Sequence, residues 1–432
     1  MTTTTQPPEG AATAETATPS TGALLLHGLR TNIRQYGMLS ALALIVLLFG
    51  FWTDGALLRP GNISNLLQQN GYILILAMGM MIVIIAGHID LSVGSVAAFV
   101  GAISAVMMIK HDLPWVVALV LSLLIGALAG AWQGFFIAYL GIPSFIVTLA
   151  GMLLFRGLTQ ITLEGQSLSP FPEGFQNLAK GVVPEAGPAW SIPLPFEFHL
   201  NLGFIELRTE AIGPYHNPTL LIGLAVVAFL LIREVRDRRR QRAYELDVLP
   251  RDIWVMKCVA IVAAVLAFTL TLASWHGLPV IMLIVCGLLL GLGHVMRNAV
   301  VGRHVYALGG NKAAAKLSGV KDKRVTFLVF VNMGVLAALA GCVFAARLNS
   351  GTPQAGLNFE LEAIAAAFIG GASMSGGVGT VLGAIIGGLV LGVLNNGMNL
   401  VGVGTDWQQV IKGLVLLAAV GIDVWNKRRG RS

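Results

Sequence analysis

The sequence predicts an all-α, polytopic membrane protein with about 10–12 transmembrane helices. Of its 432 residues, 56% are hydrophobic and only 11% are charged, whereas soluble proteins carry about 25% charged residues. Glycine contributes 52 residues, which suits helices that pack closely through small side chains in lipid. These two features of the composition exclude an ordinary soluble globular domain.

Twelve apolar runs approach the ~17–25 residues that a helix needs to cross a bilayer, with allowance for short or broken helices. They lie near residues 36–53, 71–86, 93–109, 115–140, 144–163, 218–232, 253–273, 277–296, 325–346, 361–373, 378–400 and 407–425. The runs at 218–232 and 361–373 are short, so these two could be re-entrant or could extend beyond the apolar stretch.

The basic residues predict the orientation. With the N-terminus inside, the inner segments hold 20 of the 28 Lys and Arg residues, as the positive-inside rule demands. Most lie in a basic cytoplasmic loop (233–252), a second cytoplasmic loop (297–324) and a basic cytoplasmic tail (426–432). Residues 1–35 are expected to form a disordered cytoplasmic tail. Orientation therefore explains the net charge of +7 without a nucleic-acid partner.

The segment 164–217 is predicted to lie on the outer, periplasmic or extracellular, side. Six acidic residues stand in it against two basic ones, and it is rich in Pro and Gly. It is too long for an ordinary connector. The segment could cap the outer face where a soluble partner docks, or it could be an interfacial loop whose aromatic side chains sit at headgroup level. These aromatic residues are Trp190, Phe196, Phe198 and Tyr215.

An acidic residue interrupts the apolar sequence between the second and third runs, in the segment Gly87-His88-Ile89-Asp90-Leu91-Ser92-Val93-Gly94-Ser95. An Asp at the bilayer centre costs roughly 2.5–3.5 kcal/mol, and non-helical backbone survives at that depth only where protein or a water-filled cavity satisfies it. We therefore expect a broken helix near residues 87–95. Gly87, His88, Asp90, Ser92 and Gly94 are its candidate path-lining residues, although Asp90 could instead only cap the following helix.

Glycines recur at four-residue spacing in three of the apolar runs. Gly126, Gly130 and Gly134 form one such face; Gly379, Gly383 and Gly387 form a second, and Gly287 and Gly291 a shorter third. Each face predicts close helix packing inside the chain or, alternatively, contact with another subunit. Gly370, Ser375 and Gly377 also repeat the spacing of Gly87, Ser92 and Gly94. Paired breaks in two halves of a chain are typical of the central site of transporters.

The loop at 297–324 is longer than a turn requires. Asn311 is expected to cap a short helix through residues 312–317, and Gly319 to end it. The alanines of this helix would leave a smooth surface that a partner could accept, whereas its lysines could equally be ordinary positive-inside anchors.

Four separated segments resemble, in order, the ABC-type importer permeases of the ribose/xylose/galactose class. They are residues 87–95; residues 142–149 with Arg156-Gly157; the loop from Gly302 to Asn311 with Ala314, Ala315, Ser318 and Gly319; and residues 370–380. Position 88 is His where the family signature usually has Gly. The middle of the chain holds three runs where ribose-type members have about one, which is similar to the xylose and multiple-monosaccharide branch.

The resemblance implies a permease subunit that imports monosaccharides, xylose or several pentoses and hexoses, by alternating access. Its coupling loop would dock on a separate ABC ATPase, through Gly302, Arg303, Gly310, Asn311, Ala314, Ala315, Ser318 and Gly319. ATP and Mg²⁺ would be used by that partner, since the chain has no phosphate-binding loop and no expected catalytic or metal-binding residue. The other implied partners are a second copy in a homodimer, an extracytoplasmic sugar-binding protein and the lipid of the bacterial inner membrane.

Neutral polar residues within the runs, among them Asn395, Asn396 and Asn399, suit an uncharged sugar, although any of them could simply bond neighbouring helices. The same machine could instead carry a nucleoside, a sugar-like signal molecule or an amino acid. An ion-coupled secondary transporter would need a relay of several intramembrane acids, and Asp90, Glu360 and Glu362 are few and scattered. An enzyme is disfavoured because only His88 and Asp90 form a close titratable pair.

Overall fold

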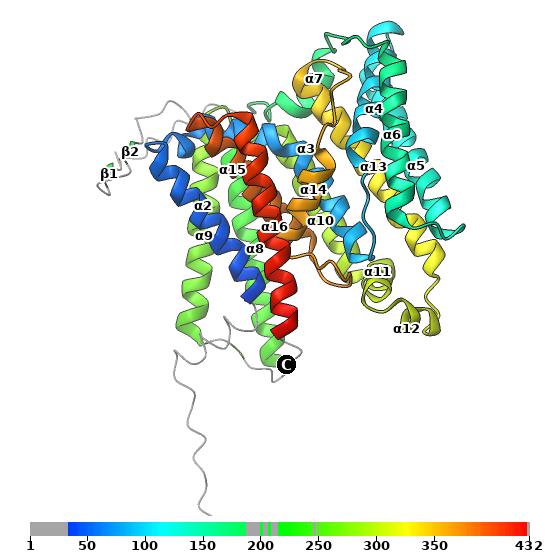
Figure 1. Ribbon diagram of the computed structural model, residues 1–432. Helices are drawn as coiled ribbons and strands as arrows, with labels where there is room; N and C mark the ends of the chain where they lie inside the picture. Colours follow the sequence, from blue (N-terminus) through cyan, green and yellow to red (C-terminus); the bar gives the residue numbers. More distant parts are fainter. Residues whose placement is uncertain are drawn as a thin grey trace, which may run out of the picture.

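The computed structural model describes residues 33–186, 199–201, 206–208, 215–244, 248 and 250–429. Within them, nine helices are long and apolar enough to cross a membrane, and residues 37–52 form a shorter apolar helix. The structure confirms an all-α polytopic membrane protein (Figure 1). Its two short strands pair only with each other, as an antiparallel hairpin with His199 opposite Arg208.

The elements follow one another along the chain with short connections in most places. They are α2 (Ile33–Trp52), η1 (Ala56–Leu58), α3 (Pro60–Ile85), α4 (Val93–Ala105), η2 (Val106–Lys110), α5 (Trp115–Ala138), α6 (Ser144–Leu163), α7 (Glu173–Lys180), β1 (His199–Asn201), β2 (Glu206–Arg208), α8 (Asn217–Ala243), α9 (Arg251–Ala273), α10 (Val280–Asn298), α11 (Val300–Gly310), α12 (Lys312–Leu317), α13 (Asp322–Leu348), α14 (Phe359–Ile369), α15 (Val381–Leu400) and α16 (Thr405–Arg429).

Local sequence explains several helix starts. Pro60 stands in the first turn of α3, where its missing N–H leaves nothing unpaired. The Thr380 hydroxyl caps α15 by accepting from the Gly383 N–H at 3.0 Å, and the His216 side chain caps α8. Each cap satisfies one of the N–H groups that a helix start leaves free.

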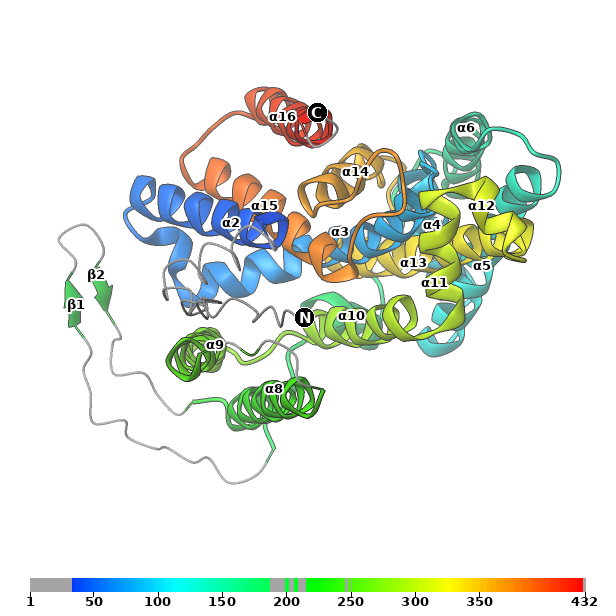
Figure 2. The ribbon, with the colours of Figure 1, turned by 90° about the horizontal axis from the view of Figure 1, so that it is seen from below.

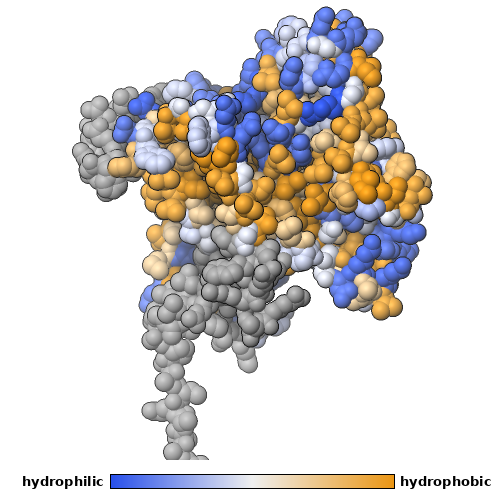
Figure 3. All heavy atoms as spheres, in the orientation of Figure 1, coloured by the Kyte–Doolittle hydropathy of each residue, from blue (hydrophilic) through white to orange (hydrophobic). Residues whose placement is uncertain are grey.

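Hydrophobic residues gather in a broad band across the middle of the molecule (Figure 3). Hydrophilic residues lie beyond it on two opposite sides. In Figure 1, α7 lies on one of these sides and α12 on the other. We call them the α7 side and the α12 side. The band has the character expected of a surface that faces lipid.

Helix α3 is the centre of the core, and α15 lies beside it. The most apolar stretch of α3 is 89% buried, whereas the corresponding stretches of α8 and α9 are 17% and 11% buried. Viewed from below, α8 and α9 form a pair outside the main group of helices (Figure 2). The chain therefore consists of a packed group around α3 with a peripheral helix pair attached.

The first glycine face packs inside the chain. A Cβ at Gly126 would collide with the carbonyl oxygen of Gly334 on α13, and one at Gly130 with the carbonyl oxygen of Phe330. Gly134 faces the same helix. Small residues thus bring α5 and α13 into backbone contact, the arrangement that stabilises helix pairs in lipid.

The second set also packs internally, whereas the third does not. Gly379 precedes α15, which begins at Val381, so only Gly383 and Gly387 share a helix face. Gly383 and Gly387 lie against the backbone of α14 and its C-terminal end. A Cβ at Gly287 or Gly291 on α10 would meet no atom within 4 Å among the described residues. Of the three faces, only the α10 face is left free by the described chain.

Two segments expected as loops are largely helical. Helix α8 continues through the basic residues to Ala243, so only a few residues connect it to α9 at Arg251. Arg, Glu, Gln and Ala favour helix, and a helix can leave the bilayer while its charged turns enter water. The segment 297–324 likewise holds α11, α12 and the helix ends beside them. As predicted, α12 spans Lys312–Leu317 and Gly319 follows it with φ +82°.

The segment 164–217, which was predicted to lie on the outer side, has structure of its own in its described residues. Phe175 of α7 is fully buried, and the backbone bridges Leu168 to Gly351 and Val182 to Pro279. These contacts hold its first half on the ends of α10 and α13. Tyr215 is half-buried, while Trp190, Phe196 and Phe198, together with most of the tail predicted at 1–35, lie outside the described residues.

Two glycine substitutions test the close contact between α5 and α13. Gly130→Val should lower the free energy of unfolding by about 1–3 kcal/mol or more, because overpacking forces α5 away from α13. Gly291→Val should change it by less than about 0.5 kcal/mol, because the site is open. Unfolding of the purified protein in mixed micelles measures both. An equal decrease in the free energy of unfolding in both variants would contradict the close contact between α5 and α13.

Candidate functional site

The predicted break lies between α3 and α4. Helix α3 ends at Ile85, and Gly87 turns the chain with φ +83°, a conformation that glycine adopts without strain. Residues 88–90 have no regular structure, and α4 begins at Val93. The His88 N–H still donates to the Val83 carbonyl oxygen at 3.1 Å, so the turn stays tied to α3.

Asp90 is the organising residue of the break and is only 2% exposed. Its Oδ1 accepts from the Ser92 backbone N–H at 2.8 Å and from the Ser92 hydroxyl at 2.6 Å. Gln133 of α5 donates its Nε2 hydrogen to the same hydroxyl oxygen at 2.5 Å. The carboxylate therefore caps the chain just before α4, and Gln133 ties this cap to α5.

A second carboxylate lies against the start of α4. Position 94 has no room for a side chain, because the Glu360 carboxylate and the Gly356 carbonyl oxygen occupy the space that a Cβ would fill. Glu360 is 8% exposed, and its Oε2 has no hydrogen-bond partner within the described part of the chain. The N-terminal end of a helix carries a partial positive charge, so α4 offers both carboxylates a favourable field.

The other predicted residues of the break have different surroundings. The His88 ring lies 5.7 Å, centroid to centroid, from Phe330 of α13 and is half-buried. Gly87 is exposed. Among the described contacts, Asp90 bonds Ser92 and not His88.

The three asparagines are not part of the break. They occupy the last turns of α15. The start of this helix, at Val381, lies about 15 residues before them, which corresponds to roughly 22 Å along the helix axis. Asn396 exchanges two amide hydrogen bonds with Asn62 of α3, at 2.8 and 3.1 Å. Asn399 accepts from Gln408 of α16 at 2.7 Å. These bonds connect helices, which was the alternative interpretation, while the Oδ1 of Asn395 is buried without a partner in the described residues.

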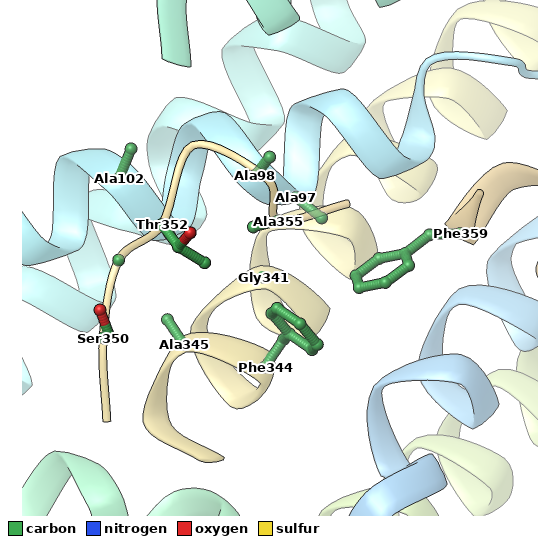
Figure 4. A pocket seen from close by; sticks show the side chains of 12 residues that line it. Ala97, Ala98, Ala102, Gly341, Phe344, Ala345, Ser350, Thr352, Ala355 and Phe359 are labelled. Atoms are coloured by element: carbon green, nitrogen blue, oxygen red, sulfur yellow. The ribbon is translucent and has the colours of Figure 1, made fainter. Parts of the chain in front are cut away.

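A small cavity of about 10 Å³, which is roughly the room that one water molecule needs, lies between α4, α13 and the segment before α14 (Figure 4). Phe344 and Phe359 line it, with ring centroids 4.9 Å apart, and Ser350 and Thr352 are its hydroxyl residues. Its other residues are small: Ala97, Ala98, Gly101, Ala102, Gly341, Ala345, Gly351 and Ala355. Because Phe359 adjoins Glu360, the cavity lies next to the cap of α4.

A second break follows α14. Residues 373–380 contain no regular helix, and Gly371, Gly376 and Gly377 all have positive φ values between 71° and 84°. Three glycines in this conformation make the chain turn sharply before α15. The repeated spacing of glycine and serine therefore corresponds to two real interruptions of helix.

Helices α11 and α12 form the predicted coupling segment. Gly302 packs directly on the backbone of Val295 and Met296, which folds α11 back against α10. Arg303 donates to the Asn298 carbonyl oxygen at 3.0 Å. The exposed surface of the segment includes Gly310 and most of α12.

The cap of α12 has the predicted form. The Asn311 side chain accepts from the Ala314 N–H at 3.0 Å, Ala315 is buried, and Ala314 and Ser318 are exposed. Leu317, the last residue of α12 and part of the segment expected to dock on a partner, is 91% exposed.

Sequence reasoning also gave no specific role to Glu360, Tyr306 or the Phe344–Phe359 pair. Glu360 lies more than 260 residues from Gly94 in the sequence, and nothing local signals their contact. Within the described residues, no group of three or more His, Cys, Asp or Glu side chains is placed to hold a metal ion. Among the described residues, the arrangement around the break is one of hydrogen bonds and close packing.

Comparison with known proteins decides the family. Residues 62–420 match the family described as the permease component of the branched-chain amino acid transport system. The chain belongs to this permease family. The match covers every helix from α3 to α15, including both breaks and the coupling segment.

Two groups of relatives refine this assignment. The xylose transport system permease protein XylH of Haemophilus influenzae is 38% identical over 400 residues, which cover 92% of this chain and 98% of the relative. XylH of Escherichia coli is 37% identical over 414 residues, 96% of this chain and 97% of the relative. The ribose import permease protein RbsC of Escherichia coli is 33% identical over 368 residues, 85% of this chain and 86% of the relative. These matches confirm the resemblance to monosaccharide permeases of the xylose branch. No solved structure gives a significant match.

Two substitutions at position 90 separate capping from direct contact with solute. Asp90→Ala removes the acceptor for both Ser92 donors and should cost about 0.5–2 kcal/mol of stability and abolish uptake while membrane insertion persists. Asp90→Asn keeps an oxygen acceptor and should retain most of both. Uptake and thermal unfolding of each variant are the measurements. If Asp90→Asn abolished uptake with normal stability, the carboxylate charge itself would be required.

Proposed function

We propose that this chain is the membrane-spanning permease subunit of an ATP-binding-cassette importer for monosaccharides, with xylose the first candidate. The observation that carries the proposal is the identity of 37–38% to xylose transport permeases over at least 92% of the chain. The two breaks and the coupling segment all lie within the matched region. The protein would reside in the bacterial inner membrane as a multi-pass subunit.

The α12 side would face the cytoplasm, together with both termini. The clusters of Arg and Lys around the ends of α8 and α10 and along α12 support this orientation. The α7 side would then meet an extracytoplasmic sugar-binding protein that delivers the sugar. The segment 164–217 would then lie on the side where such a partner docks.

ATP hydrolysis would belong to a separate ATPase subunit that binds α12. Leu317 offers an exposed apolar side chain, and Lys312 and Lys316 flank it with positive charge. Docking would bury the leucine and leave the lysines at the rim, which is the usual anatomy of a protein interface. No ATP or Mg²⁺ site is proposed in this chain.

The sugar would pass beside α4. The small cavity there lies between two phenylalanine rings and two hydroxyl side chains, the combination of apolar walls and a few polar groups that small-molecule pockets use, and it would have to widen to admit a sugar. Glu360 adjoins Phe359 at its edge. Weak binding there suits an importer in which the binding protein selects the solute and movement of the breaks admits it by alternating access.

A second copy of the chain would complete the translocation unit as a homodimer. The free face of Gly287 and Gly291 on α10 is one surface that permits such contact. Lipid would cover the other apolar surfaces, including those of α8 and α9.

An amino acid is the second candidate cargo, because the description of the matching family names branched-chain amino acid transport. The two candidates differ in charge. A free amino acid is zwitterionic at neutral pH and would need charged partners, whereas a monosaccharide needs only hydrogen bonds and apolar contact.

Uptake measurements test the proposed function. Cells with and without the gene are given labelled xylose, arabinose, galactose, glucose, ribose or leucine, and ATP depletion and a protonophore are applied separately. We expect gene-dependent uptake of xylose or several of these sugars that needs ATP and survives the protonophore. Gene-dependent uptake of leucine alone would establish the second candidate, and uptake abolished by the protonophore but not by ATP depletion would exclude the ATP-driven mechanism.

The docking surface gives a separate prediction. Leu317→Ser should weaken binding of the purified ATPase subunit about 10- to 100-fold, because burying a leucine contributes about 1.5–3 kcal/mol. The stability of the permease should not change, since the side chain is exposed. Isothermal titration or surface binding of the ATPase to the reconstituted permease measures the loss.

The matched control is Leu317→Met, which keeps an apolar side chain of similar volume and should bind within about threefold of the original. If Leu317→Ser bound the ATPase normally, α12 would not be the principal docking element.

A further inference from the structure

The end of α3, the C-terminal end of α11 and the second break meet without side chains between them. The Gly377 N–H donates to the Ile85 carbonyl oxygen at 2.8 Å, so the second break is bonded to the last residue of α3. A Cβ at Gly309 would collide with that same carbonyl oxygen and would lie 2.6 Å from the Gly377 nitrogen. Helix α11 therefore touches both breaks backbone to backbone.

Further contacts close this junction. A Cβ at Gly376 would lie 3.1 Å from the Cα atoms of both Gly87 and Gly309, so the two breaks also touch each other. Gly87 and Gly376 have positive φ values. Glycine is thus needed at these two positions for two reasons: a side chain would prevent the close approach, and the positive φ would strain any other residue.

One turn earlier on α11, a side chain makes a second link. The Tyr306 hydroxyl donates to the Gly379 carbonyl oxygen at 2.8 Å. Tyr306 and Gly309 are three residues apart and share a helix face. The second break is consequently held to α11 at two points, one polar and one of direct backbone contact.

Helix α12 follows α11 after the single residue Asn311, whose side chain caps α12. A displacement of α12 therefore acts directly on α11. Flexible side chains at a contact absorb small movements, whereas densely packed backbone atoms transmit them. The junction thus lies between the proposed docking helix and both interruptions of the membrane helices.

We propose that Gly309 is a positioning residue that transmits movement of α11 and α12 to both chain breaks at once, so that one docking event moves the two breaks together. This inference rests on the proposed function, because it takes α12 as the ATPase docking helix. It adds the mechanical link between α12 and the two chain breaks. It also requires that Gly309 contact neither the ATPase nor the solute.

A glycine on α10 supplies the matched control. Gly309→Ala places a methyl group in the junction, whereas a Cβ at Gly293 on α10 would meet no atom within 4 Å among the described residues. The same change at these two helix positions therefore differs chiefly in this contact. The complete complex of permease, ATPase and sugar-binding protein is reconstituted in liposomes with each variant. Basal ATPase activity, its stimulation by sugar-loaded binding protein, xylose uptake and ATPase affinity are measured.

We expect Gly309→Ala to lose the stimulation and the uptake, while ATPase affinity stays within about twofold because the docking surface is unaltered. Gly293→Ala should behave as the original protein in all four measurements. A purely structural role of Gly309 would instead lower assembly and affinity together. Normal stimulation and uptake in an assembled Gly309→Ala complex would overturn the proposal.

Tyr306→Phe provides a second, milder variant that decides the outcome if Gly309→Ala does not assemble. It removes one hydrogen bond to the second break and adds no atom. Stimulation should fall about two- to tenfold, the factor that one such bond contributes to an equilibrium, with ATPase affinity unchanged. Unaltered stimulation in Tyr306→Phe would then overturn the proposal. Failure of the original complex to take up any sugar with ATP would instead refute the proposed function.

Discussion

The structure depends on satisfying an open backbone within a membrane. Between Ile85 and Val93 the chain leaves the helix, and its polar groups must find partners because lipid offers none. Asp90 supplies an acceptor for the Ser92 N–H and hydroxyl, and Gln133 completes the network from α5. The break is consequently part of the packed core, and it can persist only while α5 holds its place.

Close packing follows from the same requirement. A broken helix is stable where neighbouring backbones approach it, and here the neighbours approach through glycines. Gly334 and Gly126 bring α13 to α5, while Gly94 and Gly356 bring the start of α4 to the segment before α14. The cap at Asp90 therefore sits between helices that have little freedom to separate.

The local features of the site could be predicted from sequence, and the long-range ones could not. Asn311 and Gly319 define α12 within eight residues, and Asp90 with its glycines marks the break, because capping and turning depend on neighbours in the chain. The partner of Asn396 is Asn62, and Gly309 meets Ile85 and Gly377. These pairings are set by the folded arrangement of helices, and a single sequence carries no local signal for them.

The α8–α9 pair shows how such a permease can be enlarged without disturbing its site. The two helices pack on each other, with Gly223 against Thr269, and α8 is anchored by the bond from the Leu278 N–H to the Thr219 hydroxyl at 2.8 Å. Because two additional crossings return the chain to the same side, the elements on either side keep their orientation. The pair is mostly exposed and contributes nothing to the cap of α4 or to the glycine junction. The cap of α4 and the glycine junction are therefore built by the other helices, and a substitution confined to the exposed faces of α8 and α9 would leave both unchanged.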